Sequence, residues 1–134
     1  MAGMDGSNQS LPLRVVVVDA DDLVRESLVG LLGIGRRVTV VGAAAGAEPA
    51  LDLVRRLHPD VVVVDPRLPE LAGGLDFIGR VKTIADATAV LVVGSADILE
   101  RAAARPGVDG FLRKTFRPDD LTDAILAAGR RAAG

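Results

Sequence analysis

The sequence predicts an α/β protein built on a doubly wound parallel sheet of five strands. Two observations support this fold class. First, five short apolar segments alternate with segments in which apolar residues recur at helical spacing. Second, the connections between these segments are short, and right-handed crossovers place the strands parallel to one another. Five such strands suit the order 2-1-3-4-5, in which the first and third strands are neighbours.

The expected strands are short and apolar, and they lie at residues 13–19, 38–42, 61–65, 89–94 and 108–113. The letters VVVVD occur in two of them, at Val15–Asp19 and Val61–Asp65. Four consecutive β-branched residues are typical of a strand covered on both faces. Because these two strands are neighbours in the predicted order, we expect the Asp19 and Asp65 carboxylates to face each other. They would do so at the carboxyl edge of the sheet, where open α/β sheets bind ligands.

The first expected helix begins at Asp21 or Asp22, since aspartate is a favoured N-cap residue. Its buried face is predicted from the spacing i, i+4, i+7, i+8 of Val24, Leu28, Leu31 and Leu32. The helix is predicted to end at Gly33 and Gly35.

Four more helices follow the remaining strands. The second begins near Pro49, at a position where proline is tolerated, and ends at the pair His58-Pro59. The others are expected at about 75–84, 98–104 and 118–129.

Composition excludes several classes of function. The 134 residues suffice for one domain, expected over 13–130, with a disordered N-terminal tail at 1–12 and a short C-terminal tail at 131–134. A net charge of −2 argues against a basic nucleic-acid surface, and the absence of cysteine removes thiol and zinc–thiolate chemistry. Neither a signal peptide nor a membrane span is expected, so we place the chain in the cytoplasm.

Further polar groups are expected at the same sheet edge as the two aspartates. Ser95 follows the fourth strand and Lys114 follows the fifth. Clustered carboxylates favour a hard divalent cation such as Mg²⁺. Carboxylates, a metal, a hydroxyl and an ammonium together form a cradle for a transferring phosphoryl group.

Several segments carry a family resemblance through their order and spacing. The most specific is Pro59–Pro69, followed by Gly107–Lys114; the segments Val38–Gly42, Glu48–Leu51 and Asp22–Arg25 also fit. Over residues 13–130 the chain resembles the CheY-like receiver domain of two-component response regulators. It is most similar to the subgroup joined to helix-turn-helix output domains of the NarL/LuxR type.

The resemblance implies a flavodoxin-like (βα)5 fold that acts as a switch and not as an enzyme. Asp65 would accept a phosphoryl group from a histidine kinase. The family's Mg²⁺ would be held by Asp19, Asp65 and the backbone carbonyl of Arg67.

The resemblance also implies how the switch is transmitted. Ser95 and Lys114 would contact the phosphoryl oxygens, and Phe111 would turn inward. The output surface would comprise the fourth helix, fifth strand and fifth helix, at 98–104, 108–113 and 118–129. It would bind an output protein or a fused output domain, or form a homodimer. The sequence leaves open whether the chain stands alone or belongs to a longer regulator.

The chain departs from the family at the metal site. Receivers usually carry two adjacent acids after the first strand, and here the second is Ala20. Asp21 is a candidate substitute ligand, but we favour its simpler role as the N-cap of the first helix. Pro66 offers no backbone N–H to a phosphoryl group. These changes predict an atypical receiver with weakened Mg²⁺ binding. The alternative function is a protein-interaction module in which phosphorylation is slow or absent.

An enzyme is the third interpretation. Val18–Leu23 also resembles the Asp-x-Asp motif of haloacid-dehalogenase-like phosphatases, with Asp19 as the phosphorylated residue. Asp119 and Asp120, which would supply a later motif, open a helix instead of ending a strand. No recognition helix or basic segment follows Gly129, so we expect no direct binding of nucleic acid.

Overall fold

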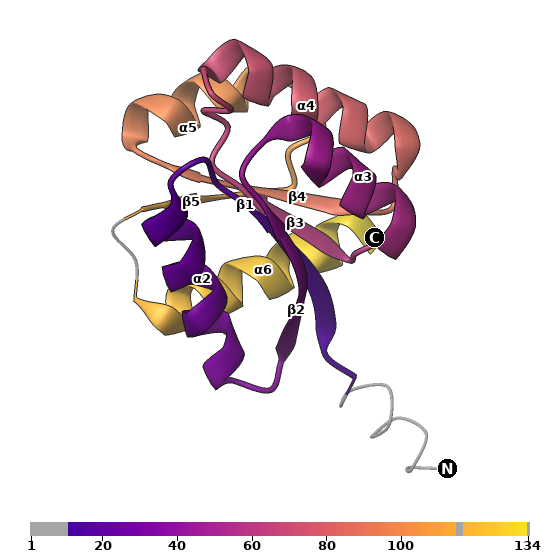
Figure 1. Ribbon diagram of the computed structural model, residues 1–134, viewed down its shortest axis with the longest axis vertical. Coiled ribbons are helices and arrows are strands. Elements are labelled where there is room, and N and C mark those ends of the chain that lie inside the picture. The colour runs from indigo at the N-terminus through magenta and orange to yellow at the C-terminus, as the bar shows by residue number, and fades with distance from the viewer. Residues whose placement is uncertain (1–10, 115–116, 134) are drawn as a thin grey trace.

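A computed structural model describes residues 11–114 and 117–133. Its sheet has five parallel strands in the order β2-β1-β3-β4-β5, which confirms the predicted topology (Figure 1). The strands are β1 (Leu13–Val18), β2 (Val38–Ala44), β3 (Val61–Val64), β4 (Ala89–Gly94) and β5 (Gly110–Arg113). The helices are α2 (Asp22–Ile34), α3 (Ala47–Leu57), α4 (Leu71–Ile84), α5 (Ala96–Ala103) and α6 (Pro118–Ala133). Most of the predicted N-terminal tail, residues 1–10, lies outside the described residues.

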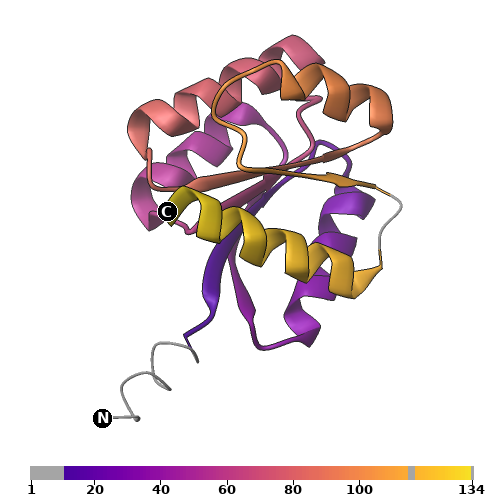
Figure 2. The ribbon, with the colours of Figure 1, turned by 180° about the vertical axis from the view of Figure 1, so that it is seen from behind.

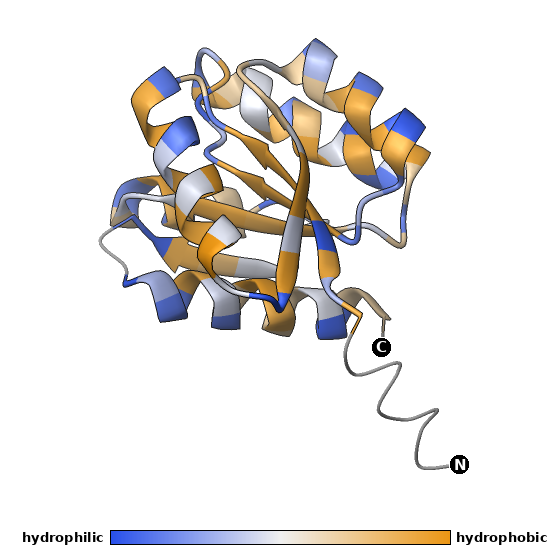
Figure 3. Cartoon of the chain, turned by 60° about the horizontal axis from the view of Figure 1, so that its bottom comes forward, coloured by the Kyte–Doolittle hydropathy of each residue, from blue (hydrophilic) through white to orange (hydrophobic). Residues whose placement is uncertain are grey.

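The sheet separates two hydrophobic cores. Helices α3, α4 and α5 cover one face, where Val16 and Val18 pack, and α2 and α6 cover the other, where Val15 and Val17 pack. Figure 2 shows α6 lying across this second face. All four valines of β1 are at most 1% exposed, which explains why these four consecutive positions are apolar. The apolar strands between helices with polar outer faces are visible in Figure 3.

The register of β1 against β3 places the two VVVVD segments side by side. Val15 pairs with Val61 and Val18 with Val64, so the aspartate after each strand leaves the sheet at the same edge. Backbone hydrogen bonds fix this edge: the N–H of Asp19 donates to the Ala44 carbonyl at 3.1 Å, and the N–H of Asp65 donates to the Val18 carbonyl at 3.1 Å.

Helix α4 begins at Leu71, and the prediction that it begins at Leu75 is wrong. Gly73 and Gly74 look like loop residues in the sequence, but they lie in the first turns of this helix. A Cβ atom on Gly74 would lie 1.4 Å from the carbonyl oxygen of Pro66. The glycine therefore permits the close approach of the helix to the loop that follows Asp65.

The end predicted for the last helix is also wrong, since α6 continues through Gly129 to Ala133. A Cβ atom on Gly129 would lie 3.1 Å from Leu13, so this glycine allows α6 to pack closely on β1 and does not end the helix. Residues 131–133, predicted as part of a tail, are helical. Smaller differences are that α5 spans 96–103 instead of 98–104, β2 extends to Ala44, and β5 starts at Gly110.

None of the helices over residues 11–114 and 117–133 is long and apolar enough to cross a membrane.

Candidate phosphoryl-acceptor site

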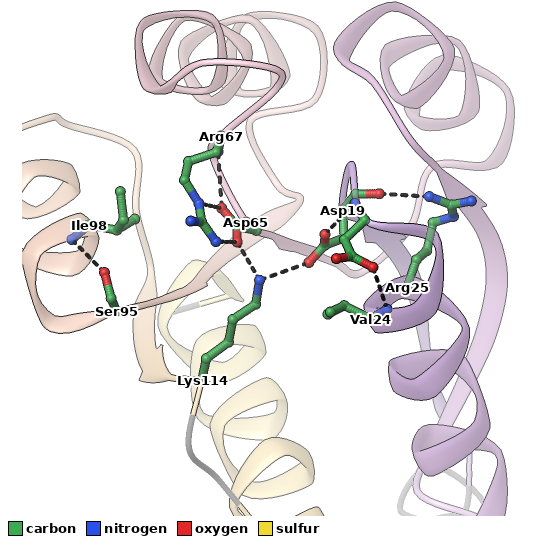
Figure 4. Close-up of polar contacts among 9 residues, drawn as sticks. Asp19, Val24, Arg25, Asp65, Arg67, Ser95, Ile98 and Lys114 are labelled. Carbon is green, nitrogen blue, oxygen red and sulfur yellow. Dashed lines mark hydrogen bonds and ion pairs between the residues drawn. The ribbon is translucent and has the colours of Figure 1, made fainter.

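Three charged side chains meet at the carboxyl edge of the sheet, as the sequence predicts. Asp19 follows β1, Asp65 follows β3 and Lys114 follows β5 (Figure 4). The N–H of Lys114 donates to the Gly94 carbonyl at 3.0 Å, which fixes its backbone beside β4. Its ammonium reaches both carboxylates, at 2.5 Å from Asp65 Oδ2 and 3.2 Å from Asp19 Oδ2.

Asp65 is buried, and cations surround its carboxylate. Only 4% of the residue is exposed. Its Oδ1 accepts hydrogen bonds from the backbone N–H of Arg67 at 3.0 Å and from Arg67 Nε at 3.1 Å. Its Oδ2 accepts from Arg67 Nη2 at 2.7 Å and from Lys114 Nζ at 2.5 Å. Arg67 therefore holds the carboxylate with a two-pronged guanidinium contact.

The charged state of Asp65 is strongly favoured. Burial alone raises its pKa, but the hydrogen bonds from Arg67 and Lys114 outweigh burial and lower that pKa from 3.8 to about 2. The same contact raises the pKa of Arg67 above its usual value. Both groups are fully ionised at neutral pH.

Asp19 is the second buried carboxylate of the site, at 3% exposure. Its Oδ1 accepts the backbone N–H of Asp21 at 2.9 Å. Its Oδ2 is buried and has no hydrogen-bond partner among the described residues, which leaves only the 3.2 Å ion pair with Lys114. Arg25 Nη1 donates to the Asp19 carbonyl at 2.8 Å and so helps to hold the residue in place.

The side chains do not fit Mg²⁺ in this arrangement. Ala20 supplies no ligand, and both oxygens of Asp65 are already taken by Arg67 and Lys114. Over residues 11–114 and 117–133, no three His, Cys, Asp or Glu side chains are grouped so that they could hold a metal ion. Asp21 accepts the N–H of Val24 at 3.1 Å, so it acts as the N-cap of α2.

The predicted switch residues lie apart from the acids. Ser95 is exposed and caps α5, with its hydroxyl oxygen accepting the N–H of Ile98 at 3.4 Å. Figure 4 shows this hydroxyl directed towards Ile98 and away from Asp65. Phe111 is 41% exposed and therefore points outward.

Sequence reasoning missed the Arg67 side chain, because only the backbone carbonyl of this residue was assigned to the site. It also missed the role of Arg25. The signal for Arg67 was its position two residues after a buried aspartate, where a long basic side chain can turn back onto the carboxylate.

The phosphatase interpretation is not supported by the geometry. Asp119 and Asp120 lie in the first turn of α6, and Asp120 accepts the N–H of Arg117 at 3.0 Å. Asp120 therefore caps the helix, and the second VVVVD segment carries the site instead.

The fold and this cluster of two aspartates and a lysine define a receiver domain. The family model for the response regulator receiver domain matches residues 15–126, and the chain belongs to this family. The assignment to two-component signalling is thereby confirmed, and the phosphatase alternative is not favoured.

Curated relatives place the chain among response regulators. It is 36% identical over 125 residues to the response regulator MprA from Mycobacterium sp. (strain KMS), covering 92% of the chain and 53% of that protein. It is 28% identical over 124 residues to the nitrate/nitrite response regulator protein NarL from Escherichia coli K12, covering 91% of the chain and 56% of that protein. The chain spans about half the length of these relatives.

Solved structures of response regulators have the same fold as this chain. A two-component response regulator of the LuxR family from Aurantimonas sp. SI85-9A1 superposes with a TM-score of 0.77 at 29% identity, covering 89% of this chain and 86% of that chain. A response regulator receiver domain protein from Clostridium thermocellum gives a TM-score of 0.76 at 27% identity, covering 90% of this chain and 97% of that chain. These similarities support the predicted relation to NarL/LuxR-type regulators.

Proposed function

We propose that Asp65 is the residue of this receiver that accepts a phosphoryl group from a histidine kinase. The observation that carries the proposal is its environment. Asp65 is a buried carboxylate at the edge of the sheet, it is held ionised with a pKa of about 2, and Lys114 touches it. An acceptor must be an ionised nucleophile, and the nearby ammonium offsets the negative charge that arrives with the phosphoryl group.

The transfer joins one Asp65 oxygen to phosphorus while the bond from phosphorus to the donor's histidine nitrogen breaks. The nitrogen keeps the electron pair of that bond. Lys114 lies on Oδ2 and is placed to contact the phosphoryl oxygens, and the Arg67 N–H beside Oδ1 is a second donor. Pro66 has no N–H to offer, so these two donors carry more of this role than in a receiver with an ordinary residue there.

Ser95 and Phe111 are the proposed switch residues. The hydrogen bond that Ser95 Oγ accepts from the Ile98 N–H is long, at 3.4 Å, so the hydroxyl can readily leave it and donate its own hydrogen to a phosphoryl oxygen. Phe111 is 41% exposed, and we propose that it turns inward on phosphorylation. Movement of both residues would alter the surface of α5, β5 and α6, which we propose as the face that binds an output protein or domain, or a second copy of the chain.

The remaining assignments follow from family membership. Receiver domains normally bind Mg²⁺ for phosphorylation, and Asp19, Asp65 and the Arg67 carbonyl are its proposed ligands here once the Asp65 carboxylate is released from its present contacts. Asp21 is a weak candidate, because its carboxylate caps α2. We place the site of action in the cytoplasm and propose signal transfer, not substrate turnover, as the activity.

The test is the intact mass of the protein after incubation with acetyl phosphate and Mg²⁺. We expect one added phosphoryl group on the wild type and none on Asp65→Asn. Addition to Asp65→Asn at the wild-type level, or no addition to the wild type, would contradict the assignment.

A further inference from the structure

Among the described residues, Arg67 makes the largest number of hydrogen bonds to the Asp65 carboxylate, and family membership does not account for its side chain. Two guanidinium nitrogens bind the two carboxylate oxygens, at 3.1 Å and 2.7 Å. The planar fork of arginine matches a carboxylate better than any other cationic side chain. The guanidinium therefore occupies the carboxylate oxygens that a metal ion would need.

The charges of the four side chains that contact one another balance without a metal, and Asp21, which also lines the site, is engaged as the N-cap of α2. Asp19 and Asp65 contribute two negative charges, and Lys114 and Arg67 contribute two positive charges. Ala20 contributes none, although receivers usually have an acid there. A divalent cation added to this arrangement would leave an excess of positive charge at a buried position, which is unfavourable.

The guanidinium is also able to move. The Arg67 side chain is 51% exposed, whereas that of Asp65 is 4% exposed. The contact therefore has one fixed, buried partner and one that can turn into solvent and be hydrated there. Lys114 is less free, since its side chain is only 26% exposed and it also pairs with Asp19.

We propose that the Arg67 guanidinium is a built-in cation that takes the place of Mg²⁺ in the resting protein and competes with it for Asp65. This proposal rests on the proposed function, because it describes how access to the same acceptor is regulated. Mg²⁺ and a phosphodonor reach Asp65 only when Arg67 turns outward. The resting site is thereby kept neutral, and its affinity for Mg²⁺ is low.

The experiment measures Mg²⁺ binding to the unphosphorylated protein. The chain contains no Trp or Tyr, so intrinsic fluorescence is a poor reporter. Isothermal titration calorimetry with MgCl₂ is suitable, supported by amide NMR shifts. The variants are Arg67→Gln, which keeps a polar side chain without the charge, and Arg67→Lys, which keeps the charge without the fork.

The matched control is Arg80→Gln. Arg80 lies on α4 and forms an exposed ion pair with Glu48 at 2.6 Å, so its replacement removes the same charge and also breaks a carboxylate contact. It does not line the site, which is formed by Asp19, Ala20, Asp21, Asp65, Arg67, Pro69 and Lys114.

We expect Arg67→Gln to tighten Mg²⁺ binding by about tenfold or more, since a charge-assisted contact of this kind has to be broken in the wild type. The Mg²⁺ affinity of Arg67→Lys should lie between those of the wild type and Arg67→Gln, and the affinity of Arg80→Gln should match that of the wild type. Unchanged or weaker Mg²⁺ binding by Arg67→Gln would overturn the proposal, as would equal tightening by Arg80→Gln.

Failure of this inference is distinguishable from failure of the proposed function. If Arg67→Gln binds Mg²⁺ more tightly but Asp65 takes no phosphoryl group in any variant, the competition stands and the acceptor assignment falls. If Asp65 is phosphorylated but Mg²⁺ binding does not respond to Arg67, the acceptor stands and the competition falls.

Discussion

Replacing Asp65 by asparagine should destabilise the protein at neutral pH. In a pocket with excess negative charge, the loss of a carboxylate relieves repulsion and stabilises the fold. Here Asp65 pairs with two cations, Arg67 and Lys114, so its removal leaves both of them without their main partner. The sign of the stability change therefore reports the charge balance of the site.

The magnitude follows from the pKa of Asp65. This pKa falls from 3.8 to about 2 on folding. Since one pKa unit corresponds to about 1.4 kcal/mol, the charged form contributes about 2 kcal/mol of stability relative to a neutral side chain. Because the folded-state pKa lies below the unfolded value, the contribution is fully present above about pH 4 and disappears as the pH falls through about 2.

The assay is urea unfolding followed by far-ultraviolet circular dichroism, between pH 7 and pH 2. Asp65→Asn should lose about 2 kcal/mol at pH 7, and its difference from the wild type should shrink at the acid end. Asp86→Asn, at an exposed turn, is the control for removing a carboxylate and should change little. An Asp65→Asn variant more stable than the wild type at pH 7 would refute the reasoning.

Three further predictions concern the surroundings of the site. Gly74→Ala should lower the free energy of unfolding by about 3 kcal/mol, because its Cβ would meet the Pro66 carbonyl oxygen. The control Gly79→Ala on the same helix, with nothing within 4 Å of its Cβ, should raise the free energy of unfolding by up to about 1 kcal/mol. Comparable urea midpoints for the two variants would contradict this prediction. Asp21→Ala should cost about 1 kcal/mol through loss of the α2 cap without changing Mg²⁺ affinity in calorimetry; a weakened affinity would make Asp21 a metal ligand. Lys114→Met should cost about 2 kcal/mol, because it removes charged contacts to both buried aspartates, and it should slow the labelling of Asp65 by acetyl phosphate; unchanged labelling would remove Lys114 from the proposed mechanism.

The sequence predicts the sheet and the place of the site because both depend on local patterns. The two VVVVD segments identify neighbouring strands buried on both faces, and the carboxyl ends of parallel strands share one edge. The convergence of Asp19, Asp65 and Lys114 follows from that topology alone.

What the sequence could not predict depends on contacts between distant atoms. Gly74 and Gly129 resemble helix breakers, but tertiary packing against Pro66 and Leu13 explains them. The position of Arg67 two residues after Asp65 permits the contact, but the direction of its long side chain is set by the buried carboxylate that it meets. The contact of Arg67 with Asp65 is therefore visible only in three dimensions, whereas the loss of an acid at Ala20 is already visible in the sequence.

The most direct test of the acceptor assignment is to locate the phosphoryl group. After treatment with acetyl phosphate and Mg²⁺, borohydride reduction converts an acyl phosphate on aspartate to homoserine, and peptide mass spectrometry identifies the modified residue. The account predicts homoserine at position 65 and unmodified Asp19. Homoserine at position 19, or at neither position, would contradict it.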